Sequence, residues 1–173
     1  MLEPKRIPSE SIPAALEKAL RYRLLNEPPQ AESICRDILL VDPDNQQASI
    51  TLLLAMTDQF ESEMARALDE ANRVLEMING DYEQAYYAGI IKERWGEAQV
   101  ASGMPVDFAL GWLREAMRFY ETAEQLSQPN DPDALLRWNT CARLVNQHEQ
   151  AKPNEVSSTH DVESFFGDDV PPR

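Results

Sequence analysis

The sequence predicts an all-α protein of seven helices arranged as antiparallel hairpins. Apolar residues recur at helical spacing along most of the chain, and no stretch has the alternation typical of a strand. Prolines and glycine-containing pairs interrupt this periodicity, so we expect short connections. The chain has 173 residues, of which 43% are hydrophobic, which is sufficient for one domain with its own core.

Three helices are expected in the first third of the chain. The first begins at Ser11, whose side chain can cap it, and ends before Pro28-Pro29 because a proline pair cannot continue a helix. The second begins at these prolines, where the missing N–H groups are not needed. Either Asp44 or Asn45 caps the third helix.

Four further helices follow. The fourth ends at residues 79–80, an Asn-Gly pair suited to left-handed termination. The fifth and sixth cover about 82–102 and 106–126. The seventh opens at residues 131–133, where a capping acid precedes a proline, and its periodicity stops near Gln147.

The fifth helix has unusual features. It is apolar nearly all round, which predicts burial between neighbouring helices. Gly89 and Gly96 each weaken it by about 1 kcal/mol relative to alanine, so we expect close approach of an adjacent helix. Glu93 shares an otherwise apolar face with Tyr82 and Tyr86, and such a carboxylate is paired, exposed at a groove or functional.

The charge of the chain restricts its partners. The formal net charge is −14, which repels phosphate backbones and anionic lipids and excludes nucleic acid and membrane surfaces as expected partners. The acidity favours a partner with a basic surface, or serves solubility alone. The first residues contain no signal peptide and no segment is long and apolar enough to span a membrane, which predicts a cytoplasmic protein. Cys35 and Cys141 lie on apolar stripes and are expected to be buried.

The sequence contains no recognisable catalytic, cofactor-binding or metal-binding motif. Its two histidines, His148 and His160, are not clustered with cysteines or acids at metal spacing. No glycine-rich phosphate loop or Gly-x-Ser-x-Gly element is present, and Cys35 has no nearby histidine to activate it. We therefore expect no enzymatic activity and no cofactor.

The first hairpin, at residues 12–45, contains a series of small and large packing residues: Ala15, Lys18, Ala19, Tyr22, Ala31, Cys35 and Pro43. The spacing of this series resembles that of a tetratricopeptide repeat. Ala19 and Ala31 occupy the small-residue positions where paired helices touch, whereas Ala15 and Lys18 replace a large aromatic residue and a leucine. Later units are degenerate, with Ala67, Ala71, Val74 and Leu75 repeating the second helix at an offset of 36.

The resemblance implies a short solenoid over residues 11–148, with about three hairpins and a C-terminal capping helix. A plain helical bundle is the alternative. In the repeat family the first helix of each pair lines a groove that holds a peptide, which makes Arg23, Tyr82, Tyr86 and Glu93 candidate partner-binding residues. The implied function is a protein-interaction module, in a narrower version a bacterial secretion-type chaperone. The alternative is a structural subunit of a larger assembly held through apolar helix faces.

Both ends of the chain differ from this helical region. Residues 1–10 are polar and are expected to be flexible, and residues 149–173 form an expected acidic, disordered tail. Phe165 and Phe166 are adjacent in this tail and flanked by acids, so they are candidates for binding a partner or the protein's own groove. A passive solubilising tail is the alternative.

Overall fold

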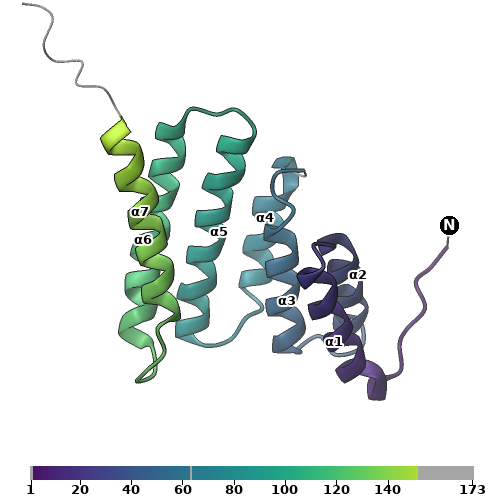
Figure 1. Cartoon of the computed structure of the whole chain (residues 1–173). Helices are drawn as coiled ribbons and strands as arrows, with labels where there is room; N and C mark the ends of the chain where they lie inside the picture. Colours follow the sequence, from purple (N-terminus) through teal and green to yellow (C-terminus); the bar gives the residue numbers. More distant parts are fainter. Residues whose placement is uncertain (1, 63, 152–173) are drawn as a thin grey trace, which may run out of the picture.

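The computed structural model describes residues 2–62 and 64–151, and these residues form seven α-helices and one short 3-10 turn (Figure 1). No strand occurs among them, which confirms the predicted all-α class. The elements are η1 Ser9–Ser11, α1 Ile12–Leu24, α2 Pro28–Leu39, α3 Gln46–Thr57, α4 Met64–Leu75, α5 Asp81–Ala101, α6 Val106–Leu126 and α7 Asp133–Ala151. None of the described helices is long and apolar enough to cross a membrane.

The helices pack in the order in which they occur in the chain. The most extensive interface joins α5 to α6, and the next join α1 to α2, α6 to α7 and α2 to α3. Figure 1 shows the resulting row, with α1 and α2 at one end and α6 and α7 at the other. Helix α1 also contacts α3, and α3 contacts α5, so α1, α3 and α5 are neighbours.

The connections contain the residues that the sequence indicated as helix breakers. Asn45, rather than Asp44, caps α3, because its Oδ1 accepts a hydrogen bond from the backbone N–H of Ala48 at 3.0 Å. Gly80 and Gly103 adopt φ angles of 95° and 91°, the left-handed region that glycine enters most easily.

Three boundaries differ from the prediction. Helix α4 ends at Leu75, where tight i→i+3 bonds from Met77 and Ile78 replace the helical pattern, and Gly80 precedes α5 instead of ending α4. Helix α7 continues to Ala151, beyond the predicted tail boundary at residue 149. The extension carries no apolar stripe, but Glu149 pairs with Arg114 of α6. The 3-10 turn η1 occupies the end of the segment expected to be loose.

Two main hydrophobic clusters form the core, and α5 contributes to both. The first joins α1–α5 and includes Leu53, Phe60 and Trp95. The second joins α5–α7 and includes Ile90, Tyr120 and Cys141. The prediction that α5 is buried between neighbours is therefore confirmed.

Small residues lie at the helix contacts that the sequence indicated. Ala19 and Ala31 are completely buried in the first cluster, together with Cys35. A Cβ atom on Gly96 would lie 3.0 Å from Cβ of Trp112 in α6, and one on Gly89 would meet the Tyr120 ring. The expected close approach of a neighbour to both α5 glycines is thus confirmed.

Candidate binding face on the odd-numbered helices

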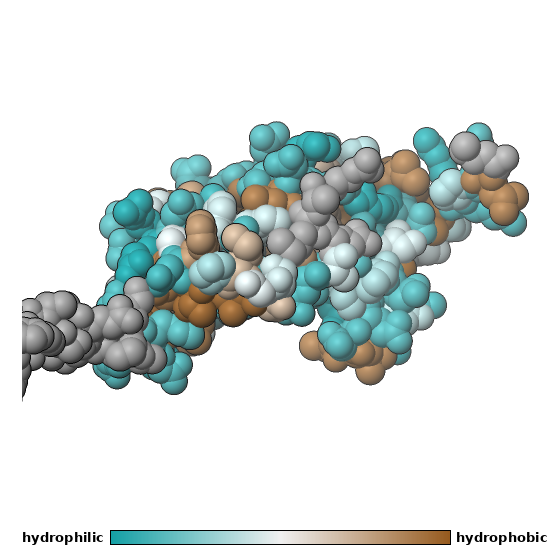
Figure 2. Space-filling model, turned by 90° about the horizontal axis from the view of Figure 1, so that it is seen from above, coloured by the Kyte–Doolittle hydropathy of each residue, from teal (hydrophilic) through white to brown (hydrophobic). Residues whose placement is uncertain are grey.

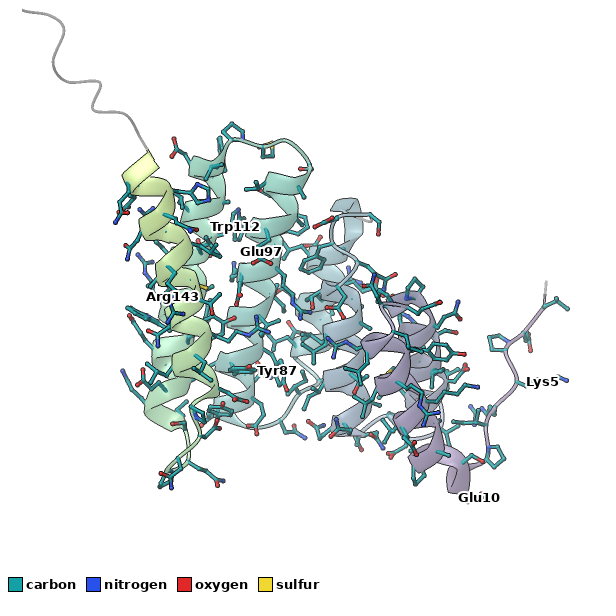
Figure 3. All side chains as sticks on the ribbon, viewed as in Figure 1. Lys5, Glu10, Tyr87, Glu97, Trp112 and Arg143 are labelled. Carbon is teal, nitrogen blue, oxygen red and sulfur yellow. The ribbon has the colours of Figure 1, made fainter. Side chains whose placement is uncertain are left out.

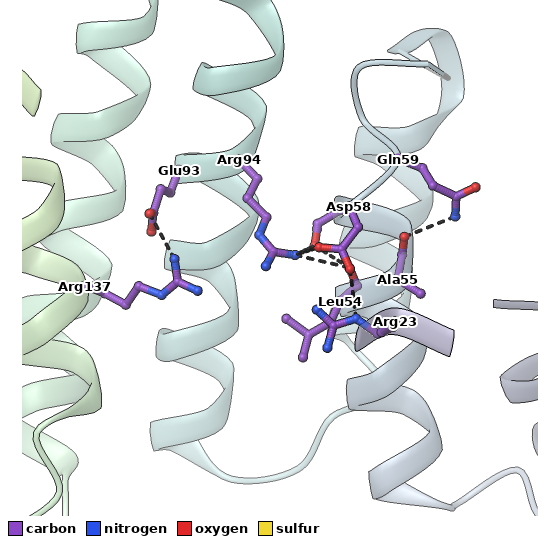
Figure 4. A network of polar contacts seen from close by, with 9 residues as sticks. Arg23, Leu54, Ala55, Asp58, Gln59, Glu93, Arg94 and Arg137 are labelled. Carbon is purple, nitrogen blue, oxygen red and sulfur yellow. Dashed lines mark hydrogen bonds and ion pairs between the residues drawn. The ribbon is translucent and has the colours of Figure 1, made fainter. Parts of the chain in front are cut away.

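A polar network crosses three odd-numbered helices on one side of the molecule (Figure 4). Arg23 of α1 donates from Nε to Oδ2 of Asp58, the residue that follows α3, at 2.8 Å. Arg94 of α5 donates from Nη1 to Oδ1 of the same carboxylate and to Oγ1 of Thr57, both at 2.6 Å. We call the surface carrying Arg23, Asp58, Arg94 and Arg137 the odd-helix face.

This network places positive charge in an otherwise acidic chain. Arg23 and Arg94 share the single Asp58 carboxylate, whereas the chain as a whole has a formal net charge of −14. Burial lowers the pKa of Arg94, and the Asp58 carboxylate partly offsets this effect. About a fifth of each arginine side chain remains exposed.

A second polar cluster links α5, α6 and α7. Glu93 is only 2% exposed. Its Oε2 accepts a hydrogen bond from the Tyr120 hydroxyl at 2.5 Å, and its Oε1 accepts one from Nη1 of Arg137 at 3.1 Å. Burial and the adjacent Glu93 carboxylate raise the pKa of Tyr120. Burial is the largest single effect on Arg137 and lowers the pKa of its guanidinium, but Glu93, Tyr120 and Tyr86 together outweigh burial and raise that pKa.

The structure therefore separates the residues that the sequence proposed for a groove. Arg23 lies in the network of the odd-helix face, whereas Glu93 is enclosed and paired, the first of the three possibilities for a carboxylate in an apolar stripe. Tyr82 and Tyr86 are half-buried and stacked, with ring centroids 5.8 Å apart.

The two tyrosines point toward α7 rather than toward α3. Burial and the nearby Asp131 carboxylate, just before α7, raise the pKa of Tyr82, and burial raises the pKa of Tyr86 against the opposing effect of Arg137 of α7. Both rings also pack against the small cluster formed by buried alanines of α5, α6 and α7. Phe165 and Phe166, the remaining candidates, lie outside the described residues.

Asp58, Arg94 and Arg137 were missed by the sequence analysis, although two signals point to Asp58 or Arg94. Arg23, Asp58 and Arg94 are separated by 35 and 36 residues, close to the offset of 36 found between the first two hairpins. Tyr87 and Arg94 are seven residues apart on α5 and therefore share a face. Neither signal identifies Arg137, which depends on how α7 packs.

A small pocket of about 180 Å³ lies between the end of α3 and α5, beside the network. Asp58, Phe60, Arg94 and Glu97 contribute to its lining. Partial desolvation and the nearby charge of Glu93 raise the pKa of Glu97. In Figure 3, Glu97 lies nearer than Tyr87 to the end of α5 that leads into α6. The pocket is smaller than the roughly 300–1,000 Å³ of most small-molecule sites and suits a single side chain.

Among the described side chains, no group of three or more His, Cys, Asp or Glu residues could hold a metal ion. No protein-family model, curated protein or solved structure matches the chain. The fold and the odd-helix face define an all-helical protein of sequentially packed helix pairs.

Proposed function

We propose that this protein is a non-enzymatic interaction module that binds a protein or peptide partner on the odd-helix face. The observation that carries the proposal is the line of Arg23, Asp58 and Arg94, contributed by three successive odd-numbered helices at nearly constant sequence spacing. Arginine is among the residues that most often dominate binding energy at protein interfaces. Such a line of similar positions suits an extended partner segment.

The proposed architecture is a short tetratricopeptide-like solenoid with α7 as its capping helix. It is supported by the buried small residues Ala19 and Ala31 and by the adjacency of α1, α3 and α5. Helices α5 and α6 depart from this plan, because each has 21 residues whereas α1 to α4 have 12 or 13. A plain bundle of helices is the alternative architecture.

The charges on the face indicate what the partner presents. Two guanidinium groups share one carboxylate, so a partner can offer carboxylate or carbonyl oxygens to Arg23 and Arg94. The net charge of −14 over the chain attracts a basic surface around this contact. We place the protein in the cytoplasm, which is supported by the free thiols of Cys35 and Cys141.

The test is affinity capture from a lysate of the source cells with two variants of α1. Arg23→Glu reverses a charge on the odd-helix face. Arg21→Glu is the matched control, because Arg21 is exposed on the same helix and pairs only with Glu17. We expect Arg23→Glu to reduce partner recovery about tenfold or more, equivalent to a loss of about 1.4 kcal/mol, and Arg21→Glu to leave it unchanged. Equal recovery with both variants contradicts the proposed face, provided that both melt as the parent does.

A second candidate is a structural subunit of a larger assembly. It is favoured by pairs of exposed leucines at the two ends of the row, Leu24-Leu25 at the end of α1 and Leu135-Leu136 in α7. Adjacent apolar residues exposed in this way are typical of contacts between subunits. Native mass measurement in the lysate distinguishes the two candidates, because a structural subunit is found only in the large complex.

A further inference from the structure

An apolar pocket lies between α5, α6 and α7 at the end of the molecule where the described chain stops. Its volume is about 290 Å³, and its apolar lining comes from Val100 of α5, Val106, Leu110 and Leu113 of α6, and Leu144 of α7. His148 and Glu97 are the titratable residues in the lining. Figure 2 looks down on this end and shows hydrophobic side chains gathered there.

The pocket remains open to solvent between three packed helices. Helices α5 and α6 form the most extensive interface of the fold, and the Arg114–Glu149 ion pair holds the last turns of α7 against α6. Val100 is exposed in the lining, and Met104 and Phe108 are exposed in the adjoining α5–α6 connection and first turn of α6. An uncovered apolar pocket of this kind is typical of a binding site for a hydrophobic side chain.

The chain itself supplies an occupant next to the pocket. His148 lies three residues before Ala151, the last described residue, so the pocket begins within one helical turn of the end of α7. Beyond Ala151, the largest apolar side chains are those of Phe165 and Phe166. Thirteen residues, 152–164, separate them from α7, which permits a span of up to about 45 Å and an r.m.s. separation of about 20 Å.

We propose that Phe165 and Phe166 dock into this pocket of the same chain. Tethering through thirteen residues gives the pair an effective concentration on the order of 1 mM at the pocket, so docking requires only weak intrinsic affinity. The acids at Asp161, Glu163, Asp168 and Asp169 remain in water on either side of the docked rings. This inference does not depend on the proposed function, since Arg23, Asp58 and Arg94 do not line the pocket.

The test uses the full chain with labelled methyl groups and labelled phenylalanine rings, observed by NMR. The variant F165S/F166S should shift the methyl signals of Val100, Val106, Leu110, Leu113 and Leu144, through loss of the ring-current effect. The signals of Leu52 and Leu53, in the other core cluster, should stay unchanged. Unchanged signals at the pocket methyls overturn the proposal.

A pair of pocket variants tests the same contact from the other side. Val106→Asp places a carboxylate in the lining at the first residue of α6, where an acid favours helix formation, so the fold should persist. Phe108→Asp adds the same charge in the same turn at an exposed position outside the lining. Val106→Asp should move the Phe165 and Phe166 ring signals to positions typical of an unstructured peptide, and Phe108→Asp should not.

Separately labelled chains, mixed before measurement, identify which molecule provides the rings. Contacts between rings and methyl groups that are seen only when both labels are on the same chain support docking within one chain. Contacts between differently labelled chains, or shifts that disappear on dilution, indicate a second copy as the occupant and overturn the proposal.

Discussion

Gly89 of α5 lies directly against the ring of Tyr120 of α6, so closely that a Cβ atom on Gly89 would be 2.4 Å from Cε1 of that ring. Tyr120 is completely buried and its hydroxyl donates to Glu93, one turn further along α5. A glycine in the middle of a helix is normally a weakness, but here it admits the ring that satisfies a buried carboxylate.

Replacing Gly89 with alanine should therefore destabilise the protein. Alanine favours helix formation by about 1 kcal/mol, but the added methyl group must displace the Tyr120 ring, and overpacking of this kind typically costs about 1–3 kcal/mol. The matched control is Gly111→Ala in α6, where the added Cβ meets no atom within 4 Å. Urea unfolding should show a loss of stability for Gly89→Ala and a small gain for Gly111→Ala. A gain for both variants contradicts the close α5–α6 contact.

The comparison of Gly89 with Arg94 shows what the sequence can and cannot predict. Glycines in an otherwise strong helical pattern indicate that a neighbour approaches closely, and this local signal predicted close approach of an adjacent helix to α5, which the structure shows to be α6. The partners of Arg23 and Arg94 depend on how helices 35 and 36 residues apart align, which no local pattern specifies. The repeat spacing contains that information only once the repeat is recognised.

Glu93 is a second residue whose partners no local sequence pattern specifies. Its place in an apolar stripe identified it as unusual, but the choice between a groove and a buried pair depended on Arg137 and Tyr120, which come from two other helices. Likewise, the end of α7 at Ala151 was missed, since the last turn has no apolar periodicity and instead gains a contact through Glu149.

Tyr120→Phe should reduce stability without changing the packing around Gly89. The substitution keeps the ring but removes the hydroxyl that donates to Glu93, which leaves Oε2 of a buried carboxylate without this donor. Such a loss typically costs about 1–3 kcal/mol. Tyr22→Phe is the control, because Tyr22 lies in α1 near Lys18 and is only partly buried, and it should change stability by less than about 0.5 kcal/mol. Equal unfolding midpoints for the two variants indicate that the Tyr120–Glu93 bond adds no net stability.

Ala31→Leu should disrupt the contact between the first helices. Ala31 is completely buried in the same cluster as Ala19, so the larger side chain has no space and should cost about 1–3 kcal/mol in urea unfolding. Ala31→Ser should be milder because it adds one small atom. Ala14→Leu, at an exposed position of α1, is the control for a change in helix propensity. Wild-type stability of Ala31→Leu contradicts the tight helix contact.

Trp138 holds α7 against α6 and should contribute moderately to stability. Its ring is half-buried against the second core cluster, and its Nε1 donates to Oε1 of Glu121 in α6 at 3.0 Å. Trp138→Ala should cost about 1–3 kcal/mol, less than the 3–5 kcal/mol typical of a fully buried tryptophan. Glu121→Ala removes only the exposed hydrogen-bond acceptor and should cost about 0.5–1.5 kcal/mol. Equal costs for the two variants indicate that the ring itself adds nothing to docking.

The two buried thiols should make stability fall at alkaline pH. Burial raises the pKa of both Cys35 and Cys141 to about 12, whereas a thiol in the unfolded chain ionises near pH 8.5. Below pH 8.5 both states keep the protons and the thiols have no effect on the pH dependence. Between pH 8.5 and 12 the thiols of the unfolded chain release their protons while those of the folded chain keep them. The free energy of unfolding therefore falls as pH rises.

The expected size of this effect can be measured directly. Raising the pH from 7.5 to 9.5 should lower the free energy of unfolding by about 1.4 kcal/mol per thiol. The control is Cys35→Ala/Cys141→Ala, whose stability should lack this part of the pH dependence even if it is lower throughout. Because the thiolate is the reactive form, neither cysteine should react with a thiol reagent at pH 8 in the native protein, and both should react in urea. Rapid reaction of either thiol in the native state contradicts its burial, and an unchanged pH dependence in the double variant contradicts the thiol linkage.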